Sequence, residues 1–195
     1  MREPEPFKIG VFGSASGNLD SLFAKAAILG QALAEKKAIT VVGTCMGLPY
    51  QTALAAQQAG GEVWLYPPFT SRASQERVLP QGADLSIFKK IITIPPDYEL
   101  ADNEAACREY RITTSTAVCN GGVIFSGGWG TAAECAALIQ KGRVVGVLTG
   151  TSGLADSLKD LEARIGLKPG ARLVYNPEPV SLVDQLWERL DKTNV

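Results

Sequence analysis

Short apolar runs alternate along the chain with longer segments in which apolar residues recur at helical spacing. The short runs are rich in β-branched and aromatic residues and end in glycine or proline, which is typical of buried strands. They predict strands at 7–12, 39–42, 62–66, 87–94, 122–126 and 144–148. The longer segments predict helices at 19–37, 48–59, 99–118, 132–141, 154–165 and 179–190.

Two stretches follow neither pattern clearly. Residues 99–118 begin with a helical pair, Glu104 and Arg108, but continue into β-branched residues at 112–116 that favour a strand. We predict helix throughout, because a helix normally separates two parallel strands. Residues 67–86 are polar and irregular, which indicates either a functional loop or a short helix.

The alternation of strands and helices predicts a single-domain, Rossmann-like α/β fold. In such a doubly wound fold a mostly parallel sheet carries helices on both faces. The length of 195 residues suits one such domain spanning residues 1–195, with residues 1–6 as a flexible polar tail.

Composition and charge narrow the functional classes. Apolar residues make up 46% and charged residues 20%, as in an ordinary soluble globule. A net charge of −1 gives no electrostatic basis for binding nucleic acid or a membrane surface. No basic leader and no run near ~18 apolar residues is present, so we expect a cytoplasmic protein.

The thiols and the missing imidazoles restrict the chemistry further. The four cysteines are widely separated and the chain has no histidine, so we expect no metal site and buried, reduced thiols. Without histidine, the usual general base and every Ser-His or Cys-His nucleophile are absent. An enzyme of this composition would use carboxylates, hydroxyls and backbone dipoles.

The chain is organised around residues 126–134, SGGWGTAAE, which join an apolar strand to an alanine-rich helix. A strand, a glycine turn and a helix start direct several backbone N–H groups and the positive end of a helix dipole to one point, which favours a phosphate. Gly127, Gly128 and Gly130 allow close approach of the anion, and the Thr131 hydroxyl adds a donor. Glu134, in the first predicted turn of the helix, would stand beside the ligand.

Two further loops of small residues follow predicted strands. Residues 13–18 begin with Gly13 and Ser14 and end at Asn18, which we expect to cap the next helix. Residues 43–47 follow the second strand. Because ligands of open α/β sheets bind at the carboxyl ends of the strands, we predict that loops 13–18, 43–47 and 127–131 meet in one crevice.

Several of these residues have a plain structural alternative. Thr131 and Glu134 match a capping box, in which both side chains only satisfy free N–H groups at the start of a helix. Trp129 is either an exposed stacking surface for a base or a side chain folded onto the protein. Arg108 and Arg111 share a helix face and are by default solvated surface residues. Ser14 either contacts the ligand or only shapes its loop.

Residues 127–134, GGWGTAAE, resemble the PGGxGTxxE signature of the LOG (LONELY GUY) family, which has often been labelled lysine decarboxylase and includes molybdenum-cofactor carrier proteins. Five fixed positions match, and Ser126 replaces the leading proline. Residues 11–14, VFGS, are similar to the first strand and loop of the family. Arg111 lies at the spacing where LOG enzymes carry a functional arginine.

The resemblance implies a phosphoribohydrolase that cleaves the N-glycosidic bond of purine or cytokinin-type nucleoside 5′-monophosphates. Glu134 would be the catalytic carboxylate and Arg111 would position the substrate and stabilise charge. The phosphate and ribose would lie on residues of the two glycine loops, namely Gly13, Ser14, Gly127, Gly128, Trp129, Gly130 and Thr131. The resemblance also implies a homodimer and no cofactor for catalysis.

Two departures from the family keep an alternative open. LOG enzymes usually have lysine after the arginine, where this chain has Ile112, and residues 43–50 keep only part of the second glycine-rich loop. The alternative is a non-enzymatic carrier or sensor of a nucleotide or a molybdopterin-type cofactor. Lysine decarboxylation is disfavoured, because it needs pyridoxal phosphate on a lysine and none adjoins the central motif.

Overall fold

The apolar runs of the sequence form the strands of one parallel sheet. In the computed structural model, which describes residues 5–193, the strand order is β4-β3-β2-β1-β5-β6-β7 and each neighbouring pair is parallel. The strands are β1 (Lys8–Gly13), β2 (Ile39–Val42), β3 (Glu62–Leu65), β4 (Lys90–Ile91), β5 (Gly121–Phe125), β6 (Val144–Leu148) and β7 (Arg172–Asn176). The predicted Rossmann-like α/β fold is therefore confirmed.

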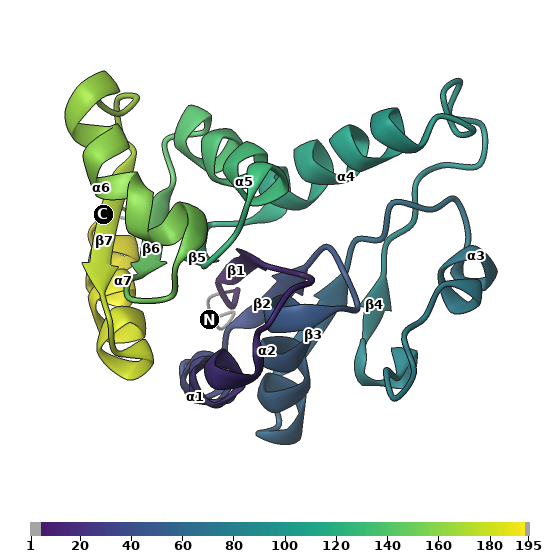
Figure 1. Cartoon of the computed structure of the whole chain (residues 1–195), viewed down its shortest axis with the longest axis horizontal. Coiled ribbons are helices and arrows are strands. Elements are labelled where there is room, and N and C mark those ends of the chain that lie inside the picture. Colours follow the sequence, from purple (N-terminus) through teal and green to yellow (C-terminus); the bar gives the residue numbers. More distant parts are fainter. Residues whose placement is uncertain (1–4, 194–195) are drawn as a thin grey trace.

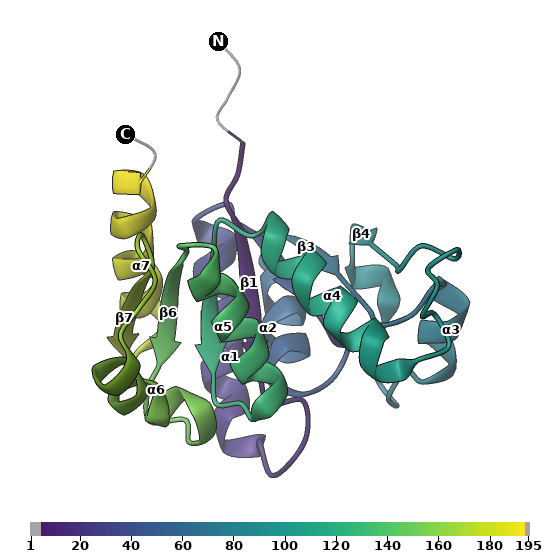
Figure 2. The same ribbon diagram turned by 90° about the horizontal axis from the view of Figure 1, so that it is seen from above.

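Helices connect the strands and cover both faces of the sheet (Figure 1). The helices are α1 (Asp20–Glu35), α2 (Gly47–Gln58), α3 (Arg72–Arg77), α4 (Glu104–Val118), α5 (Trp129–Gln140), α6 (Gly153–Ile165) and α7 (Pro179–Thr193). α1, α2 and α7 pack on one face, whereas α4, α5 and α6 lie on the other, where Figure 2 shows α4 and α5 side by side.

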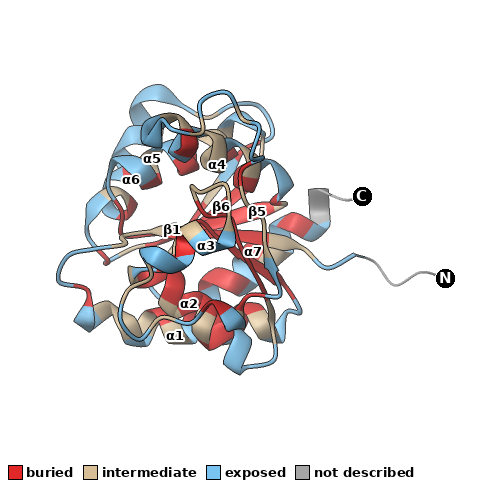
Figure 3. Ribbon diagram, turned by 90° about the vertical axis from the view of Figure 1, so that its right-hand side faces the viewer, coloured by how far each residue is buried: buried red, intermediate tan, exposed pale blue. Residues whose placement is uncertain are grey.

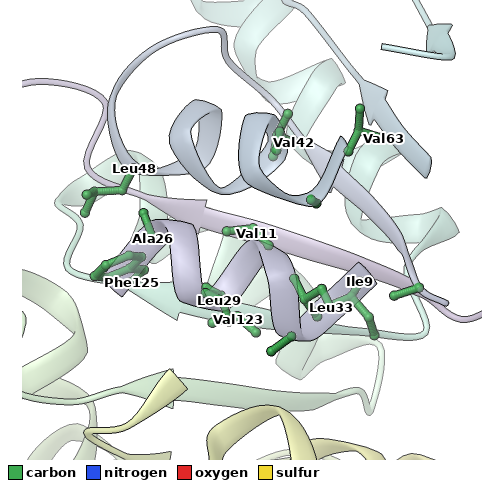
Figure 4. Close-up of a cluster of buried hydrophobic side chains, with 14 of the residues drawn as sticks. Ile9, Val11, Ala26, Leu29, Leu33, Val42, Leu48, Val63, Val123 and Phe125 are labelled. Carbon is green, nitrogen blue, oxygen red and sulfur yellow. The ribbon is translucent and has the colours of Figure 1, made fainter. Parts of the chain in front are cut away.

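Alternation along the strands produces two apolar layers. Ile9 and Val11 of β1 point into the layer beneath α1 and α2, which Figure 4 shows in detail, whereas Phe12 points into the opposite layer. The central strands β5 and β6 are buried along their whole length, so Figure 3 shows a buried centre with the exposed residues on the outer helix faces. This continuous burial is typical of a parallel sheet covered on both sides.

The direction of the chain reverses next to β1. From β1 the chain moves outward through β2, β3 and β4, and then returns to place β5 on the other side of β1 before moving outward to β7. The loops after β1 and β5 start side by side and then lead to helices on opposite faces of the sheet, α1 and α5. This switch point is where open α/β folds bind their ligands.

The strand predicted at 87–94 is mostly wrong. Only Lys90–Ile91 pair with β3, and the residues before them form a 3₁₀ turn, η1 (Leu85–Ile87). After β4 the chain leaves the sheet, and the Ile94 N–H donates to the Phe69 carbonyl at 2.9 Å. β4 is an edge strand that pairs only with β3, so the backbone groups beyond it are free to bond a neighbouring loop.

The sequence analysis also missed β7 and misplaced the start of α4. β7 has one buried residue, Val174, and the polar Arg172 and Asn176 at its ends limit its apolar run to three residues. α4 begins at Glu104 instead of residue 99, because the Asn103 side chain caps the helix by accepting the Ala106 N–H at 3.1 Å. The helix predicted through the β-branched segment is confirmed; the Thr116 hydroxyl donates back to the Ile112 carbonyl at 2.7 Å.

Two smaller predictions concern the first loop and the N-terminus. Asn18 does not cap α1, since the residue at the cap position is Leu19 and no side chain caps that helix. Of the predicted polar tail, residues 1–4 lie outside the described part of the chain. The irregular segment 67–86 contains the short helix α3, which lies beyond the β4 edge of the sheet (Figure 1). No helix in the described residues is both long and apolar enough to cross a membrane.

Candidate functional site

A cleft of about 660 Å³ opens at the carboxyl ends of β1, β2 and β5. The three small-residue loops predicted to meet all line it, so that prediction is confirmed. The contributions of these loops to the lining are Gly13, Ser14, Ala15, Ser16, Gly43, Thr44, Cys45, Met46, Gly127, Gly128, Gly130 and Thr131. Pockets of this size hold nucleotides and other small molecules.

The turn after β5 has an unusual backbone. Ser126 and Gly127 both have left-handed conformations, with φ of 57° and 100°. Three hydrogen bonds at 3.0 Å hold this turn: the Ser126 N–H donates to Thr151 Oγ1, the Gly127 N–H donates to Ser14 Oγ, and the Ser14 and Ser126 hydroxyls bond each other. Ser14 thus ties the loop after β1 to the loop after β5.

The turn leads into α5 with free backbone donors at its start. Gly128 is the cap residue, no side chain caps the helix, and the first helical bond runs from the Ala132 N–H to the Gly128 carbonyl at 2.9 Å. The N–H groups of the first turn, residues 129–131, therefore remain available. Free N–H groups and a helix dipole favour an anion, so this turn is the candidate anion site, and binding of a phosphate there stays a prediction.

The capping box considered for Thr131 and Glu134 does not form. α5 begins at Trp129, three residues earlier than predicted, so Thr131 is the third helical residue and Glu134 lies in the second turn. The reason is local: Gly128 adopts an extended conformation, with φ −117° and ψ −147°, that takes the cap position itself. Glu134 is consequently not used for capping.

Glu134 forms an ion pair with Arg111 at the side of the cleft. Arg111 comes from α4, and its Nη1 donates to Glu134 Oε1. The Glu134 side chain is buried and the Arg111 side chain is mostly buried, with exposed fractions of 7% and 14%. The residue thought by default to be a solvated surface arginine is therefore part of the cleft lining together with Glu134.

The ion pair leaves polar atoms of both side chains free to bond a ligand. Among residues 5–193, no donor other than Arg111 bonds the Glu134 carboxylate, so its Oε2 accepts no hydrogen bond. Arg111 Nε is buried and has no partner within the same residues. Burial raises the pKa of the Glu134 carboxyl above its usual value, and the attraction of the Arg111 guanidinium opposes this rise without cancelling it. A carboxyl tuned in this direction is a better base near neutral pH.

Gly43 provides the space in which the Arg111 side chain lies. A Cβ on residue 43 would be 2.6 Å from Cζ and 2.9 Å from Cδ of Arg111. The guanidinium therefore crosses directly over the backbone at the end of β2. Gly43 was predicted only as part of loop 43–47, and its contact with Arg111 has no local signal, because the two residues are far apart in the chain.

The loop after β6 supports the glycine turn from behind. Besides accepting the Ser126 N–H, the Thr151 hydroxyl donates to the Leu148 carbonyl at 2.7 Å. The Leu154 N–H donates to the Gly127 carbonyl at 2.7 Å, and any Cβ on Gly153 would collide with Gly127. This supporting role has no local signal, because the bonds join residues about 25 positions apart in the chain.

Trp129 differs from the other predicted ligand-binding residues. Its side chain is 93% exposed and is not part of the cleft lining, whereas its backbone belongs to the first turn of α5. The structure thus selects the exposed orientation over one folded onto the protein. Any contact of the indole with a ligand remains a prediction.

The far wall of the cleft comes from segments that the sequence analysis left without a role. Pro68, Phe69, Gln75, Val78 and Pro80 line it from the region between β3 and β4. Glu104 and Arg108, paired with each other on α4, line it from the side. The cleft is therefore lined by the glycine-rich loops, by a mixed apolar and polar segment between β3 and β4, and by a charged pair of α4.

The cysteines are unreactive, including Cys45 in the cleft lining, whose pKa burial raises to about 12. All four are buried and free, as the sequence predicts. Burial raises the pKa of Cys119 and Cys135 to about 12, which keeps these thiols protonated and unreactive. Within the described residues, no group of three His, Cys, Asp or Glu side chains is placed to hold a metal ion.

The fold and the site define a Rossmann-like α/β protein with a small-molecule cleft at the switch point of its sheet. The sequence of residues 6–172 matches the SLOG cluster4 family, and the chain belongs to that family, a branch of the LOG-like superfamily. The resemblance found in the motif is therefore confirmed. No curated protein sequence matches the chain.

Solved structures share the fold over nearly the whole chain. TM1055 is 18% identical with a TM-score of 0.72, over 94% of this chain and 99% of that chain. The molybdenum cofactor binding protein of Rippkaea orientalis is 14% identical with a TM-score of 0.69, over 95% and 98%. The Moco carrier protein of Chlamydomonas reinhardtii is 22% identical with a TM-score of 0.64, over 96% and 99%. At these identities the likeness shows the fold alone.

Proposed function

We propose that the protein hydrolyses the N-glycosidic bond of a nucleoside 5′-monophosphate, releasing the base and ribose 5-phosphate. The observation that carries this proposal is the buried Arg111–Glu134 pair, which lies in the lining of the same cleft as the anion site of α5. A site that only held a phosphate would need the loops but not a buried carboxylate. Water is the only co-reactant that the reaction requires.

The spacing along α5 suits such a substrate. Glu134 follows Trp129, the first residue of the helix, by five positions, which is about 7 Å along the helix axis at 1.5 Å per residue. This separation is comparable with that between the 5′-phosphorus and C1′ of one ribotide. A phosphate on the N–H groups of residues 129–131 would therefore place C1′ near the Glu134 carboxylate.

Glu134 and Arg111 would have different roles in the reaction. As the bond from C1′ to the base breaks, positive charge develops on the ribose, and the Glu134 carboxylate stabilises it. The same carboxylate, through its free Oε2, would orient the attacking water or a ribose hydroxyl. Arg111 would hold Glu134 in place and, through its remaining N–H groups, position the ribose or the leaving base.

A carrier of a nucleotide or a molybdopterin-type cofactor is the second candidate. Two observations favour it: Ile112 stands where LOG enzymes usually have lysine, and two of the similar folds are described as molybdenum-cofactor binding or carrier proteins. A carrier would use the anion site and would not depend on Glu134 chemistry. By resemblance to the LOG family, we further propose that the chain acts as a homodimer.

The test is incubation with a panel of nucleoside 5′-monophosphates, followed by assay of free base and ribose 5-phosphate. The variants are Glu134→Gln and Arg111→Ala, with Glu188→Gln on the exposed face of α7 as the matched control. Hydrolysis by the wild type and the control, lost in Glu134→Gln while ligand binding is retained, is the expected result. Tight binding without turnover would instead establish the carrier.

A further inference from the structure

A second, smaller cavity lies behind Arg111, away from the glycine loops. It has a volume of about 200 Å³, and within residues 5–193 Arg111 is the only residue that lines both this cavity and the cleft. Tyr66 after β3, Ile94 after β4 and Tyr110 of α4 form other parts of its wall. Tyr66 is buried whereas Pro95 is exposed, so the cavity reaches from the interior to the surface without passing through the cleft.

The Arg111 side chain separates the two spaces. Its Nη1 donates to Glu134 of α5, a helix that packs on β1, β5 and β6. Tyr66 lies on the opposite side, since it follows β3 and, in the parallel register of β2 and β3, comes beside Gly43, over which the guanidinium crosses. The Tyr66 ring points to the same face of the sheet as the residues packed under α5. The guanidinium is therefore held between Glu134 and the second cavity.

Arg111 carries a donor that the protein does not use. Its Nε is buried and has no hydrogen-bond partner within residues 5–193. Buried polar groups nearly always have partners, so this exception needs an explanation. Glu134 and Gly43 occupy the Nη1 side of the guanidinium, whereas the N–H of Nε belongs to the other edge of the rigid fork. That edge is turned away from the ion pair, on the side of the second cavity.

The rest of the second cavity is neutral and rich in rings. Arg111 is the only charged residue of its lining in the described part of the chain. Burial raises the pKa of the Tyr66 hydroxyl, which keeps this group uncharged. Tyr110 is held by its packing on Tyr98, with the ring centroids 4.9 Å apart. Pockets for drug-sized ligands begin near ~300 Å³, so a cavity of about 200 Å³ suits a single ring.

We infer that this cavity is a second ligand site, which binds a monocyclic aromatic carboxylate with the carboxylate on the free edge of Arg111 and the ring against Tyr66 and Tyr110. A planar carboxylate accepts two parallel N–H bonds from one edge of a guanidinium, which gives the unused Nε an acceptor. Aromatic walls bind the faces of the ring. The occupant differs in size and chemistry from the nucleotide proposed for the cleft, and the inference does not rest on hydrolysis.

Binding of benzoate to the full chain tests the inference. Dissociation constants are measured by isothermal titration calorimetry for benzoate and for its neutral analogue benzamide, with and without ribose 5-phosphate. Thr114→Leu fills the cavity from α4 with a good helix former, and Thr113→Leu, exposed on the same helix and outside the lining, is the matched control. Arg111→Lys keeps the positive charge and removes the N–H of Nε.

The expected pattern locates the carboxylate in the second cavity. The wild type and Thr113→Leu should bind one benzoate per chain, about 10-fold or more tighter than benzamide, because a hydrogen bond to a charged group is gained. Thr114→Leu and Arg111→Lys should each weaken benzoate about 10-fold or more. Ribose 5-phosphate should change the benzoate Kd only up to a plateau, because ligands in separate sites bind together.

Four results would overturn the inference. They are no binding of benzoate, equal affinity for benzoate and benzamide, wild-type affinity in Thr114→Leu, and a benzoate Kd that rises without limit as ribose 5-phosphate is added, which would place benzoate in the cleft. The comparison of Thr114→Leu with Thr113→Leu decides the location even if ribose 5-phosphate does not bind. Failure of the hydrolase proposal is a distinct outcome, since the wild type would then lack turnover while its binding of benzoate stayed as expected.

Discussion

The position of Arg111 depends on the absence of a side chain at residue 43, and Gly43→Ala tests this dependence. The φ of Gly43 lies outside the left-handed region, so alanine fits its backbone and the substitution acts only through the added methyl group. That methyl would approach Arg111 Cζ to 2.6 Å, about 0.8 Å short of ordinary van der Waals contact at 3.4 Å. The guanidinium must therefore move.

The consequence should be large for activity and smaller for stability. A displacement on the order of 1 Å at a positioning group lowers rates roughly 10²-fold, so we expect kcat/KM for nucleotide hydrolysis to fall about 10²- to 10³-fold. Loss of one partner from a buried ion pair destabilises by up to ~3–5 kcal/mol. The loss here should lie below that range, since the Arg111 side chain can swing into the cleft and Glu134 can take up a proton.

A double-mutant cycle identifies the mechanism. Hydrolysis rates and urea unfolding are measured for Gly43→Ala, Arg111→Ala and the double variant. If the methyl group acts by displacing Arg111, the double variant should match Arg111→Ala in rate. The reasoning is refuted if Gly43→Ala keeps the wild-type rate, or if it lowers the rate further when Arg111 is already absent.

Three further substitutions test the surrounding structure. Burial raises the pKa of Glu134 in the folded protein above its value in the unfolded chain, so the free energy of unfolding should fall as pH rises from the unfolded to the folded pKa. Urea unfolding between about pH 4 and 8 measures this fall as the difference in stability between the wild type and Glu134→Gln. A difference that does not change with pH would contradict the prediction. Thr151→Val leaves the buried Ser126 N–H without an acceptor and should lower unfolding free energy by about 1–3 kcal/mol, whereas Thr151→Ser should not. Trp129→Ala should change stability by less than about 0.5 kcal/mol and leave ribose 5-phosphate affinity unchanged; weaker binding would show that the indole contacts the ligand.

Most strands, most helices and the glycine loops could be predicted because each is encoded locally, and the meeting of the loops then followed from the general rule for open α/β sheets. A strand that is buried on both faces, such as β5, has no polar residue to interrupt it. The loop that follows it can be recognised by its run of small residues. β7 lacked this signal, because only Val174 of its five residues is buried. An edge strand such as β7 pairs on one side only and is less buried, so its sequence need not contain a long apolar run.

The site divides in the same way. The anion site follows from the composition of residues 127–131, but the start of α5 did not, since the pattern of Thr131 and Glu134 imitates a cap that Gly128 provides instead. Arg111 and Glu134 are 23 residues apart and on different helices, and family resemblance, not local pattern, singled out the arginine. The buried Arg111 Nε, unpartnered within residues 5–193, had no sequence signal either, because burial and partners are set by contacts between distant residues.

The region between β3 and β4 leaves the sheet at its edge and returns to it after contributing one wall of the cleft. Arg111, Glu134 and the uncapped start of α5 are instead held by β1, β5 and the helices beside them, at the centre of the fold. One wall of the cleft therefore belongs to a stretch of chain that carries little of the central sheet. Changes in the length or sequence of that stretch would reshape the cleft without disturbing the sheet.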